Sequence, residues 1–407
     1  MRRFGPVLIL AVLTAAAGPV FAEICSVDQK PAATLLVPYF EVSLAGPGVE
    51  TLLSIHNAEG TPVIGNLVVW SDVGIPIFGI PFALRGYDVY TLDLRAILTT
   101  GKIPPTDIVP PGCTGLLPLG ELNPAVLESS RMVLTGQPHP AFPGQCQGLS
   151  LPGRPTNAHG FITIDVVKSC TLLLPSNFEY FNDGIIHTRN ALWGTTIFID
   201  NAASLAHAMP MVHIEASATR SETAYQPNPR KPANYTFYAR MVGWTGLDNR
   251  EPLATDFGIR FYTVPPAGTT ELFVWRDSKH PPVGGFPCAA GSPIKLGQRK
   301  IVAFNETSGA YTFPTRRSFP FPVMAQRVKV NGPTLVIPPA IGGFGWLFLN
   351  LNHSDGSDEV PSLYKDFAQA WVFGIANTAT PPIFTGAFEA MQYDSACRGR
   401  IKLPRIP

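Results

Sequence analysis

The chain has 407 residues, with 30 basic and 29 acidic side chains, so its net charge is close to zero. Charged residues make up only 14% of the sequence and form no basic patch, which argues against nucleic acid as a partner. The apolar content of 45% excludes a disordered chain, while 42 prolines and 37 glycines favour short strands joined by many turns.

Residues 1–22 have the three-part pattern of a cleavable export signal. Arg2 and Arg3 supply the positive start, an apolar run follows over residues 7–17, and small residues precede a cleavage point after Ala22. The apolar run is too short to span a bilayer comfortably, so we expect no transmembrane segment in the mature chain. The sequence therefore predicts a protein that is secreted, periplasmic or attached to the cell surface.

Alternating apolar and polar residues predict strands along the whole mature chain. In chain order these are Leu52–Asn57, Asn66–Trp70, Tyr87–Leu94, Phe161–Val167, Thr196–Asp200, Met211–Ala216, Ile259–Val264, Glu271–Trp275, Trp346–Asn352 and Ala368–Ile375. A helix is predicted at Pro124–Thr135, where Asn123 caps the first turn and Gly136 closes the last, and a helical turn is predicted near residues 95–100.

Many strands with few helices predict a mainly β fold of two antiparallel, Ig-like β-sandwich domains. We place the first domain at residues 23–185 and the second at 186–407. Residues 101–155 are rich in proline and glycine and are expected to form a long excursion from the first domain.

All six cysteines follow the predicted signal and none lies in a C-x-x-C pair, so neither zinc nor thioredoxin-like chemistry is indicated. In an exported protein three disulfides are expected, with fifteen pairings open. Pairing within the proposed domains favours Cys113–Cys146, Cys25–Cys170 and Cys288–Cys397.

Several strings in the mature chain resemble a family of uncharacterised exported bacterial proteins. The resemblance implies a bacterial, exported protein, and it carries no activity, ligand or catalytic residue to this chain. The strings are residues 34–42, 164–167, 192–194, 212–216, 274–277 and 345–352.

The motifs of familiar enzymes are missing: the sequence has no H-E-x-x-H, no P-loop and no dinucleotide fingerprint. His213 and Glu215 are the most interesting polar pair, because on a strand they point to the same face. A carboxylate beside an imidazole serves acid–base chemistry or holds a metal. The plainer interpretation is a solvated sheet face.

The polar turn at residues 352–359 contains Asp355, Asp358 and Glu359. Oxygen-rich loops of this kind hold Ca²⁺, although the EF-hand pattern is not met here. A calcium site and an ordinary hairpin loop both remain open, and no other cofactor is expected. Trp244, between two nearby glycines, is the tryptophan predicted to be exposed for binding.

These observations predict an exported structural or binding protein that recognises a polysaccharide or a surface protein through loops at the sandwich ends. The alternative is a secreted hydrolase or metal-dependent enzyme that uses His213 and Glu215 or the acidic turn. An enzyme should show a deep pocket around this pair, whereas a binding module should show aromatic side chains on a shallow face.

Overall fold

The computed structural model describes residues 30–117, 120–216, 236–242, 248–264, 268–278, 284–290, 296–307, 309–314, 321–352, 369–378 and 385–395. Every pair of named strands in these ranges is antiparallel. The mainly β, sandwich-type fold class is confirmed, and the Ig-like relationship stays a prediction.

The first sandwich consists of two sheets around an aliphatic core that includes Leu35, Ile55 and Ile164. The sheet that we call inner sheet 1 has the order β10 (Val212–Ile214), β1 (Thr34–Ser43), β7 (Asn157–Val167), β3 (Val63–Ser71) and β4 (Pro76–Leu84). Outer sheet 1 has the order β5 (Val89–Asp93), β2 (Val49–Asn57), β8 (Leu192–Asp200) and β9 (Leu205–Pro210).

The second sandwich repeats this plan around a core that includes Ile259, Leu272 and Leu347. Inner sheet 2 has the order β16 (Ala325–Lys329), β12 (Gly268–Arg276), β18 (Ala370–Thr378) and β19 (Thr385–Glu389). Outer sheet 2 has the order β15 (Ala310–Thr312), β14 (Lys300–Phe304), β17 (Phe344–Asn350), β11 (Ala254–Tyr262) and β20 (Met391–Ser395).

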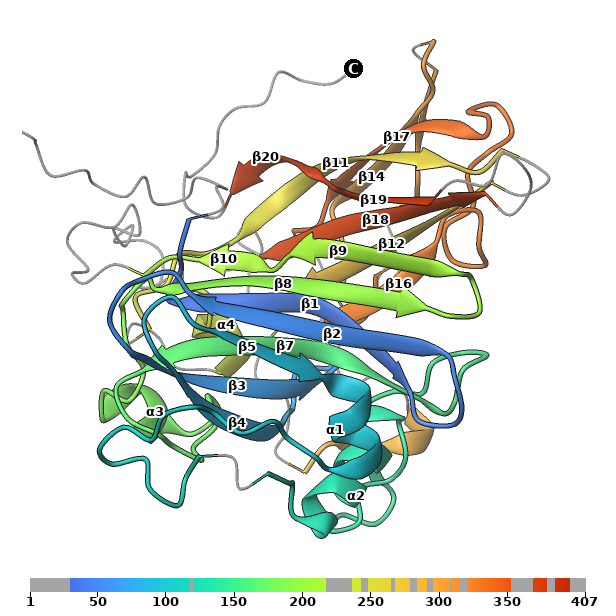
Figure 1. The fold of residues 1–407 in the computed structure, drawn as a ribbon. Helices are drawn as coiled ribbons and strands as arrows, with labels where there is room; N and C mark the ends of the chain where they lie inside the picture. The colour runs from blue at the N-terminus through green and yellow to red at the C-terminus, as the bar shows by residue number, and fades with distance from the viewer. Residues whose placement is uncertain are drawn as a thin grey trace, which may run out of the picture.

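The two inner sheets pack against each other, and inner sheet 2 also reaches the β8–β9 side of outer sheet 1, where β9 runs beside the second sandwich (Figure 1). Their shared core is aromatic: the rings of Tyr39 and Phe273 lie 5.2 Å apart, and those of Phe161 and Trp275 lie 5.9 Å apart. Strand β1 is consequently buried over its whole length, because its two faces belong to two different cores.

The boundary that we predicted at residue 185 is too early for the observed sheets. Strand β8 pairs with β2 along nine residues, and β10 pairs with β1. Strands β8 to β10 therefore complete the first sandwich, and the strands of the second begin at Ala254. The sequence did not indicate this, because β8 has the same alternating pattern as a strand of either sandwich.

The predicted cysteine pairing is wrong where the structure tests it. The disulfides are Cys113–Cys170 and Cys146–Cys288, while Cys25 and Cys397 lie outside the described residues. The excursion at 101–155 does not close on itself: its strand β6 (Gln145–Cys146) pairs with β13 (Phe286–Pro287). The disulfide Cys146–Cys288 connects the excursion to the first residue of a 3-10 turn at Cys288–Ala290, in the second half of the chain.

The two predicted helical segments are confirmed as α1 (Leu94–Thr100) and α2 (Pro124–Leu134). Asn123 accepts a hydrogen bond from the backbone N–H of Ala125, as expected of a cap, and Gly136 takes a positive φ of 72°. The short helices α3 (Phe178–Asn182) and α4 (Ala239–Val242) complete the named elements. None of the helices in the described ranges is long and apolar enough to cross a membrane.

Candidate functional site

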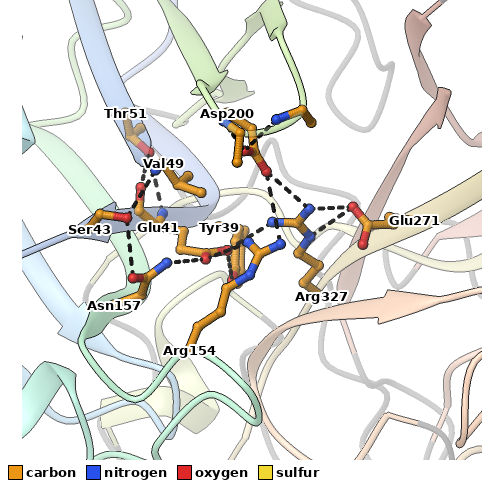
Figure 2. Close-up of polar contacts among 12 residues, drawn as sticks. Tyr39, Glu41, Ser43, Val49, Thr51, Arg154, Asn157, Asp200, Glu271 and Arg327 are labelled. Carbon is orange, nitrogen blue, oxygen red and sulfur yellow. Dashed lines mark hydrogen bonds and ion pairs between the residues drawn. The ribbon is translucent and has the colours of Figure 1, made fainter. Parts of the chain in front are cut away.

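A cluster of charged side chains lies where three of the four sheets meet (Figure 2). Its centre is Glu41 of β1, which is completely buried. The Glu41 carboxylate accepts hydrogen bonds from Arg154 at 2.8 Å, from Asn157 at 2.7 Å and from the Tyr39 hydroxyl at 2.9 Å. A buried carboxylate with this many donors is well compensated for the loss of water.

Arg327 of β16 joins the two sandwiches in this cluster. Its guanidinium donates to Glu41 at 3.1 Å and to Glu271 of its own sheet, and it lies 3.6 Å from Asp200 at the end of β8. It also lies 5.4 Å from the ring of Phe273, within cation–π range. Three sheets therefore meet on one side chain that is 11% exposed.

The charges of the cluster stabilise one another. Burial alone would raise the pKa of Glu41, but Arg327 and Arg154 outweigh it and lower that pKa. Burial would likewise lower the pKa of Arg327, but Glu271 and Glu41 raise it. Glu41 and Arg327 are thus both ionised at neutral pH, and their ion pair connects the two sandwiches.

A second buried network centres on Asp165 of β7. Its carboxylate accepts hydrogen bonds from the hydroxyls of Tyr180 and Tyr238, each at 2.8 Å, and Arg250 lies 3.5 Å away. Burial, followed by the charge of Asp165, raises the pKa of both tyrosines, so both stay protonated. This network holds the segment between the two sandwiches against inner sheet 1, and it too is structural.

The solvent-facing side of outer sheet 1 carries a different type of surface. Strands β2 and β8 alternate strictly between buried and half-buried residues, so one face of this sheet is open. Cross-strand register places Val89, His56 and Trp193 in one row across β5, β2 and β8. We call this the aromatic row.

A row of hydroxyl side chains lies next to the aromatic row. Thr91, Ser54 and Thr195 are aligned across the same three strands, two residues along from Val89, His56 and Trp193. Ser54 Oγ lies 2.9 Å from His56 Nε2, which connects the two rows. Burial lowers the pKa of His56, so its imidazole is neutral at pH 7.

The indole of Trp193 is held in place from two sides. The His56 ring lies 5.3 Å from it and the His213 ring 5.8 Å, both nearly perpendicular to the indole. His213 comes from β10, after the chain has crossed from outer to inner sheet 1. Trp193 is therefore a half-buried aromatic side chain in a fixed position on an open sheet face.

The predicted pair His213 and Glu215 lies on and just after β10. His213 packs against Trp193, whereas the backbone of Glu215 exchanges hydrogen bonds with Glu251, on the segment leading to the second sandwich. A cleft between the sandwiches, described below, is lined by neither of them. Trp244, Asp355, Asp358 and Glu359 lie outside the described residues, and no group of three potential metal ligands occurs in the described ranges.

Sequence reasoning missed both the charged cluster and the aromatic row. The signal for the cluster was a lone glutamate, Glu41, inside the apolar run of residues 34–42. The signal for the aromatic row was Trp193 at an outward position of an alternating strand. Trp70, Trp275 and Trp371, which lie in apolar stretches of the sequence, are buried.

The fold and the surface together define an antiparallel, disulfide-linked protein of two β-sandwiches with an aromatic and hydroxyl-bearing outer sheet face. Comparison of the chain with protein-family models, with curated proteins and with solved structures finds no match.

Proposed function

We propose that this chain is an exported binding protein that recognises a polysaccharide on the open face of outer sheet 1. The observation that carries the proposal is the aromatic row, with Trp193 fixed between two imidazoles beside three aligned hydroxyls. A fixed indole offers an apolar surface to a sugar ring at little entropic cost, and neighbouring hydroxyls and imidazoles exchange hydrogen bonds with sugar hydroxyls.

The low charge of these two rows favours a polysaccharide over a protein partner. The two rows contain no Lys, Arg, Asp or Glu side chain, and His56 is neutral at pH 7. Successive outward residues on a strand lie roughly 6.6 Å apart and neighbouring strands roughly 4.8 Å apart, so the rows cover an area of sugar-ring size. A neutral, elongated chain fits such a surface without meeting an unpaired charge.

The disulfides and the predicted signal support export. Disulfides persist in oxidising compartments, so Cys113–Cys170 and Cys146–Cys288 favour a periplasmic, surface or secreted location. The signal itself, with its cleavage point after Ala22, lies outside the described residues and is part of this proposal. So is the bacterial family that the sequence resembles.

The buried charged cluster favours a preformed binding surface. Arg327, Glu41 and Asp200 link three sheets, so the sandwiches have no hinge between them at this point. A rigid surface binds without a large ordering cost. The secreted hydrolase that would use His213 and Glu215 remains the alternative, but the ring contact of His213 with Trp193 favours a role in fixing the indole.

The test compares two tryptophans on the two outer sheets. Trp346 is half-buried on outer sheet 2, where the guanidinium of Arg260 covers it at 4.5 Å, so it is the matched control. Mobility of the mature protein is measured in native gels containing neutral or acidic polysaccharides. We expect Trp193→Ala to abolish the retardation of the wild type and Trp346→Ala to keep it.

Equal retardation of the wild type and Trp193→Ala would show that binding occurs elsewhere. Absence of retardation by every polysaccharide would overturn the carbohydrate proposal and favour a protein partner. Circular dichroism of both variants establishes that each is folded.

A further inference from the structure

A narrow cleft opens at the seam between the two sandwiches. Its walls come from β1 and from the edges formed by β9 and β19, with Trp371 and Phe373 of β18 at its side. Strand β1 is irregular here, because its register to β7 shifts between Val37 and Phe40. The edge strands β9 and β19 contact each other through His207 and Thr385, at 3.1 Å.

The cleft combines aromatic walls with three polar groups that a ligand could bind, of which only the Thr196 hydroxyl is shut off from water. Thr196 is 4% exposed and its Oγ1 makes no hydrogen bond. In the described part of the chain, the Glu389 carboxylate takes part in no hydrogen bond or ion pair, and the Trp371 indole N–H donates to no acceptor. The fully buried Trp70, by contrast, donates its indole N–H to Thr163 at 2.8 Å.

The buried Thr196 hydroxyl lowers stability because it has lost water without gaining a hydrogen-bond partner. Glu389 is exposed at the mouth of the cleft, yet its surroundings keep its carboxyl partly out of water, and this burial raises its pKa. A ligand hydroxyl in the cleft would pair the buried Thr196 hydroxyl and could also reach the indole N–H of Trp371 and the carboxylate of Glu389, which line the same cleft.

The three groups select the chemistry of the ligand. An indole N–H only donates, a carboxylate only accepts, and a threonine hydroxyl does both. A hydroxyl group satisfies all three, because it accepts from the indole and donates to the carboxylate. An ammonium group would leave the indole N–H unpaired, and an anionic group would be repelled by Glu389.

We propose that the seam cleft is a second carbohydrate subsite, which takes one hydroxyl-bearing end of a saccharide between Trp371, Thr196 and Glu389. Its narrow width suits a single hydroxymethyl or ring hydroxyl rather than a whole sugar ring. Pro210, which lines the cleft, lies directly opposite Thr195 of the hydroxyl row on the neighbouring strand. The cleft and the hydroxyl row therefore adjoin across β9. Binding of one polymer to both surfaces rests on the proposed function. Binding of a free sugar in the cleft does not.

The test uses neighbouring threonines with opposite orientations. Thr196 points to the cleft and Thr195 to the open face, so Thr196→Val and Thr195→Val are a matched pair. Glucose, galactose and mannose are titrated separately into ¹⁵N-labelled protein, and the indole N–H signals are followed. The Trp371 signal is assigned from Trp371→Phe.

We expect at least one sugar to shift the Trp371 signal. Loss of one hydrogen bond weakens binding about fivefold to tenfold, so Thr196→Val should raise the dissociation constant by that factor, while Thr195→Val leaves it unchanged. Glu389→Gln should weaken sugar binding and at the same time raise thermal stability at pH 7, a combination that a purely structural carboxylate would not produce.

No shift of the Trp371 signal with any of the three sugars, or unchanged affinity in both Thr196→Val and Glu389→Gln, would overturn the subsite. The polysaccharide gels with Trp193→Ala and Trp346→Ala are unaffected by that result, so failure of the cleft and failure of the proposed function are separate outcomes.

Discussion

Replacing Arg327 by methionine tests whether the charged cluster holds the two sandwiches together. Methionine keeps much of the length and the apolar contact with Phe273 but removes the charge. The variant leaves Glu41 completely buried with Arg154 as its remaining guanidinium partner, and it deprives Asp200 of its contact at 3.6 Å.

The size of the effect follows from burial. Removing one partner of a buried ion pair typically costs 3–5 kcal/mol, because the other charge is left uncompensated. Arg154 still donates to Glu41 at 2.8 Å, although 39% of its side chain is exposed and water screens its charge. We therefore expect Arg327→Met to lower the free energy of unfolding by about 3 kcal/mol, the lower end of that range.

The assay is urea unfolding at pH 7 with the disulfides intact, followed by circular dichroism. The matched control is Arg260→Met: Arg260 lies 2.9 Å from Glu306, but the two side chains are 58% and 40% exposed. An exposed pair contributes about 0–1 kcal/mol, so this variant should unfold nearly like the wild type.

The double variant Glu41→Gln/Arg327→Met should be no less stable than Arg327→Met, because it no longer buries an uncompensated carboxylate. If Arg327→Met and Arg260→Met cost the same small amount, the cluster does not hold the sandwiches together and our reasoning is wrong.

Three further predictions concern pH, the disulfides and backbone packing. Folding lowers the pKa of Glu41, so its contribution to stability is present above the ordinary value of 4.5 and is lost as pH falls through the folded-state pKa. The stability difference between the wild type and Glu41→Gln should therefore shrink in acid unfolding curves. A constant difference from pH 7 to pH 3 would contradict this. The disulfide Cys146–Cys288 closes a separation of 142 residues, so replacing both cysteines by serine should lower the free energy of unfolding by up to about 5 kcal/mol in non-reducing urea titrations. Peptide mapping that shows any other partner for Cys146 would refute this disulfide. A Cβ on Gly160 would lie 2.0 Å from the backbone oxygen of Trp70, so Gly160→Ala should disturb the pairing of β7 with β3 and lower the melting temperature by several degrees, whereas unchanged melting would mean that the two strands separate at little cost.

The sequence by itself determined those features that depend on local pattern. Alternation identified outward and inward residues of β2 and β8, and the Asn-Pro start with its later glycine identified α2. Recurrent alternation with few helix signals indicated a mainly β fold, and the many prolines and glycines fitted short strands joined by turns.

Strand β1 shows where local pattern fails. Its residues carry no alternation, because Leu35 and Val37 face the first core while Leu36 and Tyr39 face the shared core between the sandwiches. A strand buried on both faces lacks the period of two on which the prediction rests. Glu41 in this strand is tolerated only because Arg154 and Arg327, distant in sequence, compensate its charge.

Only the tertiary structure decided the two candidate sites and the disulfides. His56, Trp193 and His213 meet because β10 crosses from one sheet to the other, and Thr196, Trp371 and Glu389 meet because β9 lies against β19. Cys146 reaches Cys288 because the excursion extends to the second half of the chain. Contacts between residues so far apart depend on how whole sheets stack, and the alternation within each strand contains no information about which sheet will cover it.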